Sequence, residues 1–187
     1  MHKQQRRFPA YSAVFAIALL ALVLTACQEE TFARIDQADN YPNWNISHAG
    51  DLVEQVPGHP VFLRRIYAND AAYNVDPDSD GNVVFPEGAL FMKEMYFGEV
   101  PDDSAGPDAL VGMYKDSTDP RNRGGWVWFS QDPATGQQTV LDEEFCITCH
   151  ANANEEHPYG DRNIAEAFMD YVYYPPALNV RADAAQP

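Results

Sequence analysis

The sequence predicts one α+β domain, built mainly on an antiparallel β-sheet with a few flanking helices. The chain has 187 residues with 10 Tyr, 10 Phe and 3 Trp, enough apolar surface for a single core, which excludes whole-chain disorder. Short runs of β-branched and aromatic residues alternate with turns rich in Asp, Pro and Gly, and there is no internal repeat. Runs separated by such turns are typical of neighbouring antiparallel strands.

Five segments are predicted as strands. The first, 61–67, reads Val-Phe-Leu-Arg-Arg-Ile-Tyr, and the second, 89–97, is rich in Phe, Met and Tyr. Three shorter strands are predicted at 112–115, 126–131 and 137–141. Turn residues bound all of these segments.

Two helices are predicted outside these strands. Ser47 can cap a short helix that runs through Val56. Asp161 can cap a second helix, whose apolar residues recur every four positions until the proline pair at 175–176 ends it. The apolar positions of this second helix are Ile164, Phe168 and Val172.

Residues 1–26 are predicted to be an export signal. Basic residues among the first seven precede an uncharged run from Tyr11 to Ala26, which is too short to span a membrane comfortably. The run leads into Leu-Thr-Ala-Cys27, which resembles the lipobox of bacterial lipoproteins, where the cysteine is acylated and becomes the first residue after cleavage. The alternatives are an ordinary signal peptide with an incidental cysteine and an uncleaved membrane anchor.

The expected location is the bacterial periplasm, with a lipid anchor at the outer membrane. The Arg-Arg-Phe triplet at 6–8 resembles a twin-arginine signal, but its flanks match poorly, so general secretory export is expected. Gln28 rather than Asp follows the cysteine, which by analogy with such lipoproteins favours the outer membrane. The polar residues 27–40 are predicted as a tether, 41–180 as the domain and 181–187 as a frayed tail.

Charge and cysteine count limit the functions that this domain can have. The chain carries 28 acidic residues against 12 Lys and Arg, a net charge of −16. Nucleic acid is therefore excluded as a partner, because phosphate binding depends on clustered Lys and Arg. Three cysteines are too few for a disulfide scaffold. One of them is the predicted anchor Cys27, and the other two lie in a single motif.

That motif, from Cys146 through Cys149 to His150, reads C-x-x-C-H, the attachment signature of c-type haem. Residues three and four apart share a helix face, so both sulfurs can reach the vinyl groups while His150 ligates the iron. Zinc would need four ligands, and the sequence has no second cysteine pair. A redox dithiol would need a βαβ context, which is absent. The sequence therefore predicts one covalent haem c near the C-terminus.

The group opposite His150 decides what such a haem can do. A sixth protein ligand favours electron transfer, whereas an open position permits ligand binding or chemistry. Met169 fits a helical core pattern, and His157 is followed by turn residues. His48 and His59 carry no ligand signature either. An open or weakly occupied position is therefore expected.

Lys93 lies on an apolar face of the second predicted strand. Period-two alternation groups it with Ala89, Phe91, Met95 and Phe97. Burying an ammonium group without a partner is costly. Alternation alone therefore favours a lysine that extends its amine toward solvent, with a functional role as the alternative.

Several segments together resemble the cytochrome P-460 family, small exported haem c proteins with a mainly antiparallel fold. They are Arg64-Arg65-Ile66-Tyr67, Gly88-Ala89-Leu90-Phe91-Met92-Lys93-Glu94, Lys115-Asp116-Ser117, Gly125-Trp126, the C-x-x-C-H motif and Asp170-Tyr171-Val172-Tyr173. The resemblance implies that Lys93 is bonded to a haem meso carbon. In the related c′-beta cytochromes the cross-link is absent, and an apolar pocket binds gases such as NO.

The resemblance also implies an activity, the oxidation of hydroxylamine or a related small nitrogen compound, with Lys93 modifying the haem ring. A distal carboxylate would help to remove protons, and its candidates are Asp142, Glu143 and Glu144, with a solvated loop as the alternative. The expected partners are a soluble redox protein such as another cytochrome c and a second copy of the chain in a homodimer. The alternative function is a non-enzymatic cytochrome that binds NO or carries electrons.

Residues 76–87 fit the pattern of an EF-hand calcium loop. The candidate ligands are Asp76, Asp78, Asp80, Asn82 and Glu87. Gly81 occupies the turn position, but Pro86 and the strand after it leave no room for an exiting helix. A structural calcium ion is one prediction for this loop, and an acidic turn is the alternative.

Overall fold

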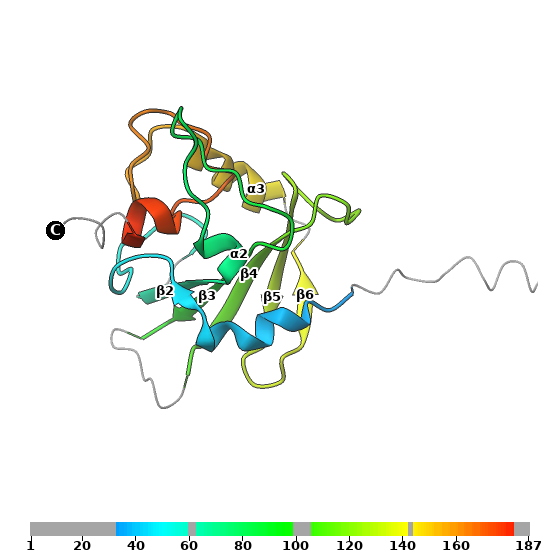
Figure 1. Cartoon of the computed structure of the whole chain (residues 1–187). Coiled ribbons are helices and arrows are strands. Elements are labelled where there is room, and N and C mark those ends of the chain that lie inside the picture. Colours follow the sequence, from blue (N-terminus) through cyan, green and yellow to red (C-terminus); the bar gives the residue numbers. More distant parts are fainter. Residues whose placement is uncertain (1–32, 60–62, 99–105, 142–143, 182–187) are drawn as a thin grey trace, which may run out of the picture. The chain divides into compact units, whose positions relative to one another are not determined.

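A six-stranded antiparallel sheet forms the centre of the domain (Figure 1). The computed structural model describes residues 33–59, 63–98, 106–141 and 144–181. Within these ranges the strands are β1 (Asn45–Ile46), β2 (Leu63–Ala68), β3 (Leu90–Tyr96), β4 (Ala109–Lys115), β5 (Trp126–Gln131) and β6 (Gln138–Val140). They pair in chain order from β1 to β6, so the predicted α+β class with a mainly antiparallel sheet is confirmed.

The helical segments are short and cover both faces of the sheet. They are the 3-10 helices η1 (Asp36–Asn43) and η2 (Asn152–Asn154), the α-helices α2 (Asp70–Tyr73) and α3 (Glu144–Ala151), and the π-helix η3 (Ala177–Arg181). η1 crosses one face, while α2 and α3 lie over the other (Figure 1). Across the described parts of the chain, every helix is too short or too polar to span a membrane.

The predicted strands agree well with the observed ones. The segments 89–97, 126–131 and 137–141 correspond to β3, β5 and β6, while 112–115 is only the second half of β4. β2 runs from Leu63 to Ala68, and residues 61–62 of the predicted first strand lie outside the described ranges. β1 escapes prediction because its two residues are too few to show a pattern.

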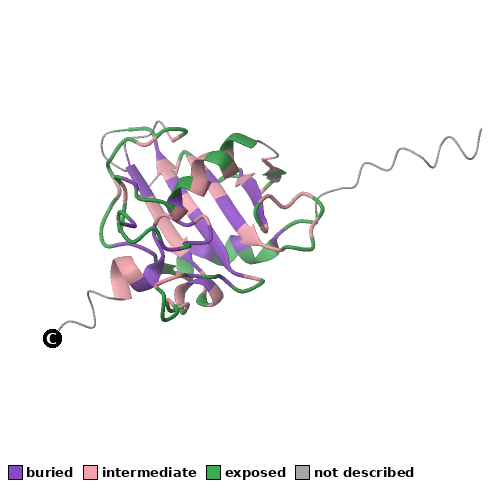
Figure 2. Ribbon diagram, turned by 90° about the horizontal axis from the view of Figure 1, so that it is seen from above, coloured by how far each residue is buried: buried purple, intermediate pink, exposed green. Residues whose placement is uncertain are grey.

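β3 is a central strand whose side chains alternate between the two faces. It pairs with β2 and β4, so that Lys93 stands opposite Ile66 on one side and Val111 on the other. Phe91, Lys93 and Met95 point to the α3 face, and the residues between them point to the η1 face. The middle of the sheet is largely buried, while exposed residues gather in the surrounding loops (Figure 2).

On the η1 face, a buried glutamate joins η1 to the sheet. Glu94 accepts hydrogen bonds from the hydroxyls of Tyr41 in η1 (2.9 Å), Tyr67 (3.1 Å) and Tyr96 (3.0 Å). Burial, followed by the charge of Glu94, raises the pKa of Tyr41 and Tyr96 above the ordinary value. A hydrogen bond to a charged group contributes about 1.5–3 kcal/mol, so this cluster is a strong attachment for η1.

The predicted helix from Ser47 to Val56 is wrong. Its residues instead hydrogen-bond to β2, where the Ser47 amide donates to the Ile66 carbonyl (2.9 Å) and the Leu52 amide to Arg64 (3.0 Å). These backbone amides would pair with carbonyl groups of the same segment in a helix. Here the edge of β2 provides the carbonyl partners instead.

The predicted helix from Asp161 to the proline pair is also wrong. Five non-glycine residues of this segment have positive φ, a conformation that interrupts a right-handed helix: Arg162, Asn163, Glu166, Asp170 and Tyr171. The buried Asn163 side chain holds the irregular path, donating to the carbonyls of Ala153 (2.9 Å) and Ala167 (2.8 Å) and accepting from the Ala167 amide (2.9 Å). These local bonds replace the helical ladder.

The domain extends beyond both of its predicted boundaries. Within the predicted tether, the Ile35 amide donates to Gln138 (2.8 Å) and Ala38 is buried, so residues 34–40 belong to the domain. At the other end, Arg181 completes η3 and forms an ion pair with Asp76 (2.8 Å). The rest of the predicted tail, like the export signal and Cys27, lies outside the described residues.

Candidate functional site

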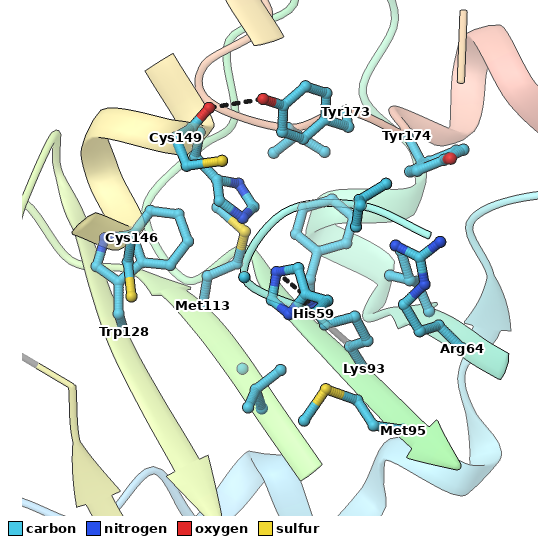
Figure 3. A pocket seen from close by; sticks show the side chains of 18 of the residues that line it. His59, Arg64, Lys93, Met95, Met113, Trp128, Cys146, Cys149, Tyr173 and Tyr174 are labelled. Carbon is cyan, nitrogen blue, oxygen red and sulfur yellow. Dashed lines mark hydrogen bonds between the residues drawn. The ribbon is translucent and has the colours of Figure 1, made fainter. Parts of the chain in front are cut away.

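A cavity of about 370 Å³ lies between α3 and the sheet (Figure 3). Most of its wall is apolar or aromatic, including Ile66, Phe91, Met95, Val111, Met113, Trp128, Leu141, Phe145 and Val172. The lining residues that carry an ionisable group are His59, Arg64, Lys93, Cys146, Cys149, His150, Tyr159, Tyr173 and Tyr174. An apolar cavity with a few convergent polar groups is typical of a ligand or cofactor site.

α3 presents the C-x-x-C-H motif to this cavity. Cys146, Cys149 and His150 lie three and four residues apart on the helix, and all three line the pocket. This confirms the predicted helical turn, with the three side chains on one face. Neither cysteine is in a disulfide bond.

His150 is held in one orientation by its surroundings. Its Nδ1 lies 2.8 Å from the Tyr171 carbonyl oxygen. Because a carbonyl only accepts, Nδ1 carries the proton, which leaves the Nε2 lone pair available to a metal. The rings of Trp128 and Tyr173 pack edge-on against it, with centroids at 4.6 and 5.4 Å. Burial, followed by the charge of Lys93, lowers the pKa of His150 to about 4, so the imidazole is neutral at physiological pH.

Lys93 points into the same cavity rather than out to solvent. Phe91 and Met95 line the cavity beside it, whereas Ala89 is buried in the core and Phe97 is 52 % exposed. The interpretation of Lys93 as a solvent-extended side chain is therefore wrong. Burial, followed by the charge of Arg64, lowers the pKa of Lys93 to about 7. At neutral pH a substantial fraction of this amine is uncharged and able to act as a nucleophile.

His59 is the pocket residue that the sequence does not reveal. Both of its ring nitrogens lie within hydrogen-bond distance of the Lys93 amine, at 2.9 and 3.1 Å (Figure 3). Its ring centroid is 6.4 Å from that of His150. Burial, followed by the charges of Lys93 and His150, holds the pKa of His59 far below its ordinary value. His59 is therefore a neutral group, and its surroundings strongly oppose protonation.

Arg64 supplies a buried positive charge at the cavity wall. Its side chain is almost wholly buried, with 3 % exposed, and it donates to the Glu54 carbonyl. Its Nε has no hydrogen-bond partner, and no salt bridge joins Arg64 to a carboxylate among the described residues. A buried hydrogen-bond donor without a partner is unusual in a folded protein.

Together these residues fit a haem. A haem offers a flat apolar ring, two vinyl groups, an iron and two carboxylates. The cavity offers apolar walls, two cysteine sulfurs, an imidazole with a free Nε2 and, in Arg64, a buried cation able to pair with a carboxylate.

The comparison with known families agrees with this geometry. A profile described as Cytochrome P-460 matches residues 38–174, most of the chain. The chain belongs to the cytochrome P-460 family. Membership implies a haem cofactor and makes the protein a haem cytochrome. No curated protein shows a significant match to the chain.

Three other candidate ligands of this cytochrome P-460 domain lie away from the cavity. Met169 is buried in the core, with 4 % exposed, as its pattern indicates. His157 packs against Tyr159 and Tyr173 and lies 3.5 Å from Asp161. His48 accepts a hydrogen bond from the Ile66 amide at 3.1 Å. None of these side chains lines the pocket.

The distal carboxylate predicted from the cytochrome P-460 resemblance is not found among the described residues. Glu144 begins α3 and is exposed, and it does not line the pocket. Asp142 and Glu143 lie outside the described ranges.

The predicted calcium ligands are not brought together. Asp76 pairs with Arg181, and Glu87 accepts from the Ser117 hydroxyl (2.7 Å). Asp78 accepts hydrogen bonds from the backbone amides of Asp80 and Asn82, both at 2.9 Å. The hydrogen bond from the Asn82 side chain contributes most to lowering the pKa of Asp78, and these two backbone bonds contribute next. Among the described residues no group of three His, Cys, Asp or Glu side chains could hold a metal ion. The described loop is an acidic turn stabilised by its own hydrogen bonds, and the calcium prediction is not confirmed.

Proposed function

We propose that this cytochrome oxidises hydroxylamine or a related small nitrogen compound on a covalently attached haem c. The supporting observation is that the Lys93 amine and His150 face one apolar cavity. Cys146 and Cys149 would form the thioethers, and His150 Nε2 would ligate the iron. When bound, the haem supplies the redox chemistry, and the electrons leave to a soluble redox partner such as another cytochrome c.

Lys93 is proposed to bond to a meso carbon of the haem. Only an uncharged amine has the lone pair that such a bond requires, and the lowered pKa of Lys93, about 7, makes this form accessible. The new N–C bond replaces one N–H and one C–H bond, so an oxidant of the peroxide class takes up two electrons and two protons. Arg64, which lines the same cavity as Lys93, would form an ion pair with a haem carboxylate.

His59 is proposed to accept a hydrogen bond from the substrate and so to position it, because its low pKa makes it a poor proton acceptor. It is neutral and faces the cavity, within hydrogen-bond distance of Lys93. We expect His59→Leu to lower kcat/KM for hydroxylamine by about fivefold, because the substrate loses a hydrogen bond worth about 1 kcal/mol. The control is the apolar Val111→Leu on β4, which keeps every ionisable group of the pocket. Equal kcat/KM in His59→Leu and the wild type would exclude this role.

The experiment that tests the proposed function is steady-state turnover of the purified, haem-loaded protein. Hydroxylamine is supplied with an oxidised soluble cytochrome c or an artificial electron acceptor, and acceptor reduction is followed. We expect hydroxylamine-dependent reduction of the acceptor. No turnover with any acceptor, together with tight NO binding and an ordinary c-type haem spectrum, would instead favour the non-enzymatic alternative.

The protein is proposed to be an exported lipoprotein, anchored through Cys27 to the outer membrane. We expect Cys27→Ser to move it from the membrane fraction to the soluble periplasm, because acyl chains contribute about 0.8 kcal/mol per buried CH₂. Immunoblotting of the two fractions measures this, with Thr25→Ser as the control. A Cys27→Ser protein that stays with the membrane would indicate an uncleaved N-terminal segment.

A further inference from the structure

A buried cluster outside the cavity holds the segment that follows the C-x-x-C-H helix. Its centre is Asp170, whose side chain is 2 % exposed. The Lys115 amine, at the end of β4, lies 2.7 and 2.8 Å from the two carboxylate oxygens. The Phe85 amide donates to the same carboxylate at 2.9 Å. The indole Nε1 of Trp126, at the start of β5, donates to the Asp170 carbonyl (3.0 Å) and carboxylate (3.2 Å).

The parts of this cluster fit together closely. The Lys115 amine lies 4.9 Å from the centre of the Trp126 ring, a cation–π contact. Gly125 has φ +83°, and a Cβ there would come within 3.1 Å of the Lys115 amine. Lys115, the Gly125-Trp126 pair and Asp170 therefore form one unit, which we name the Asp170 clasp.

The clasp stabilises a backbone conformation that is otherwise unfavourable. Asp170 has φ +47° and Tyr171 has φ +69°, both in the left-handed region that non-glycine residues rarely adopt. Such a conformation persists where surrounding contacts determine it. Here the contacts are the two ionic hydrogen bonds from Lys115 and the indole bond to the carbonyl of Asp170 itself.

This conformation directs the Tyr171 carbonyl toward the imidazole of His150. The carbonyl belongs to the residue directly after Asp170 and accepts from His150 Nδ1 at 2.8 Å. A hydrogen bond at this nitrogen fixes the tautomer of a ligating histidine and makes it a more basic ligand. The chain of contacts therefore runs from Lys115 and Trp126 through Asp170 to the Tyr171 carbonyl and His150.

We propose that the Asp170 clasp sets the donor strength of His150 by holding the Tyr171 carbonyl on Nδ1. Asp170, Lys115 and Trp126 are positioning residues, because they act on the metal ligand through another group. The inference rests on His150 as the iron ligand of the proposed function and is independent of the substrate. A weakened clasp makes His150 a weaker donor, which disfavours ferric iron relative to ferrous iron.

The test uses the haem-loaded protein and two variants of the clasp. Trp126→Phe keeps an aromatic ring but removes the Nε1 donor, and Asp170→Asn keeps a residue type that tolerates positive φ but removes the charge. We expect both to lower the ferrous iron–histidine stretching frequency, measured by resonance Raman spectroscopy, and to raise the reduction potential. If Asp170→Asn does not fold, Trp126→Phe alone decides.

The matched control is Tyr41→Phe, on the opposite face of the sheet. It removes a buried hydrogen bond to the Glu94 carboxylate, which also accepts from the hydroxyls of Tyr67 and Tyr96. We expect it to lower the melting temperature and leave the stretching frequency and the potential unchanged. The proposal is overturned if Trp126→Phe shifts neither quantity, or if Tyr41→Phe shifts them equally. A wild type without an iron–histidine band would instead contradict the role of His150 in the proposed function.

Discussion

Replacing Cys146 and Cys149 together with alanine in the Lys93→Arg protein is expected to leave a protein with no covalent haem. Both sulfurs face the cavity from one turn of α3, so the double change removes both proposed thioethers. Because Lys93→Arg also removes the proposed bond to the meso carbon, only coordination by His150 remains. Haem staining after denaturing electrophoresis measures the result. The whole signal should disappear, rather than a fraction of it.

The control for this change lies within the same motif. Thr148 stands between the two cysteines and is exposed, so Thr148→Ala should keep full staining. A double-alanine variant of the Lys93→Arg protein that still stains after denaturation would show that the haem is attached elsewhere.

Replacing Lys93 with arginine is expected to abolish hydroxylamine turnover and to move the ferrous Soret band to the position of an ordinary c-type cytochrome. Arginine keeps a positive charge in the pocket, but its guanidinium stays protonated and cannot form the bond to the ring. Haem staining should persist, because Cys146 and Cys149 are unchanged. The measurements are the absorption spectrum of the reduced protein and the steady-state rate with hydroxylamine.

Met95→Leu is the matched control for Lys93→Arg. Met95 lies two residues along β3 and lines the same cavity, so this nearly isosteric change perturbs the wall without touching the amine. It should leave both the Soret band and the turnover close to those of the wild type. Full turnover in Lys93→Arg would contradict the proposed role of Lys93.

The parts of the fold that the sequence predicts are those with a local signal. β3 and β5 are dense in β-branched, aromatic and apolar residues bounded by turns, and the structure places both among the interior strands of the sheet. The helical turn of the C-x-x-C-H motif is likewise determined by spacing. In contrast, the periodicity of Ile164, Phe168 and Val172 is misleading, because the side chain of Asn163 provides competing hydrogen bonds to the backbone.

The parts of the site that sequence reasoning misses depend on contacts between distant residues. His59 has no motif, and its place in the pocket comes from a pairing with Lys93 across 34 positions. The alternation pattern shows which face of β3 carries Lys93. It does not show which other elements cover that face, so it cannot distinguish a buried amine from an exposed one. Contacts between distant residues also leave the calcium prediction unconfirmed, since Arg181 and Ser117 pair with two of the expected ligands.

The central claim is that Lys93 and the C-x-x-C-H motif hold one haem between them, and a proteolytic digest of the haem-loaded protein tests it most directly. Intact mass alone is insufficient, because thioether attachment already adds the haem. The haem-containing fragment should be isolated by its absorbance and analysed by mass spectrometry. The account predicts one fragment with three parts: the peptide containing 146–150, the haem and a second peptide containing Lys93. A haem fragment with the 146–150 peptide alone would contradict it.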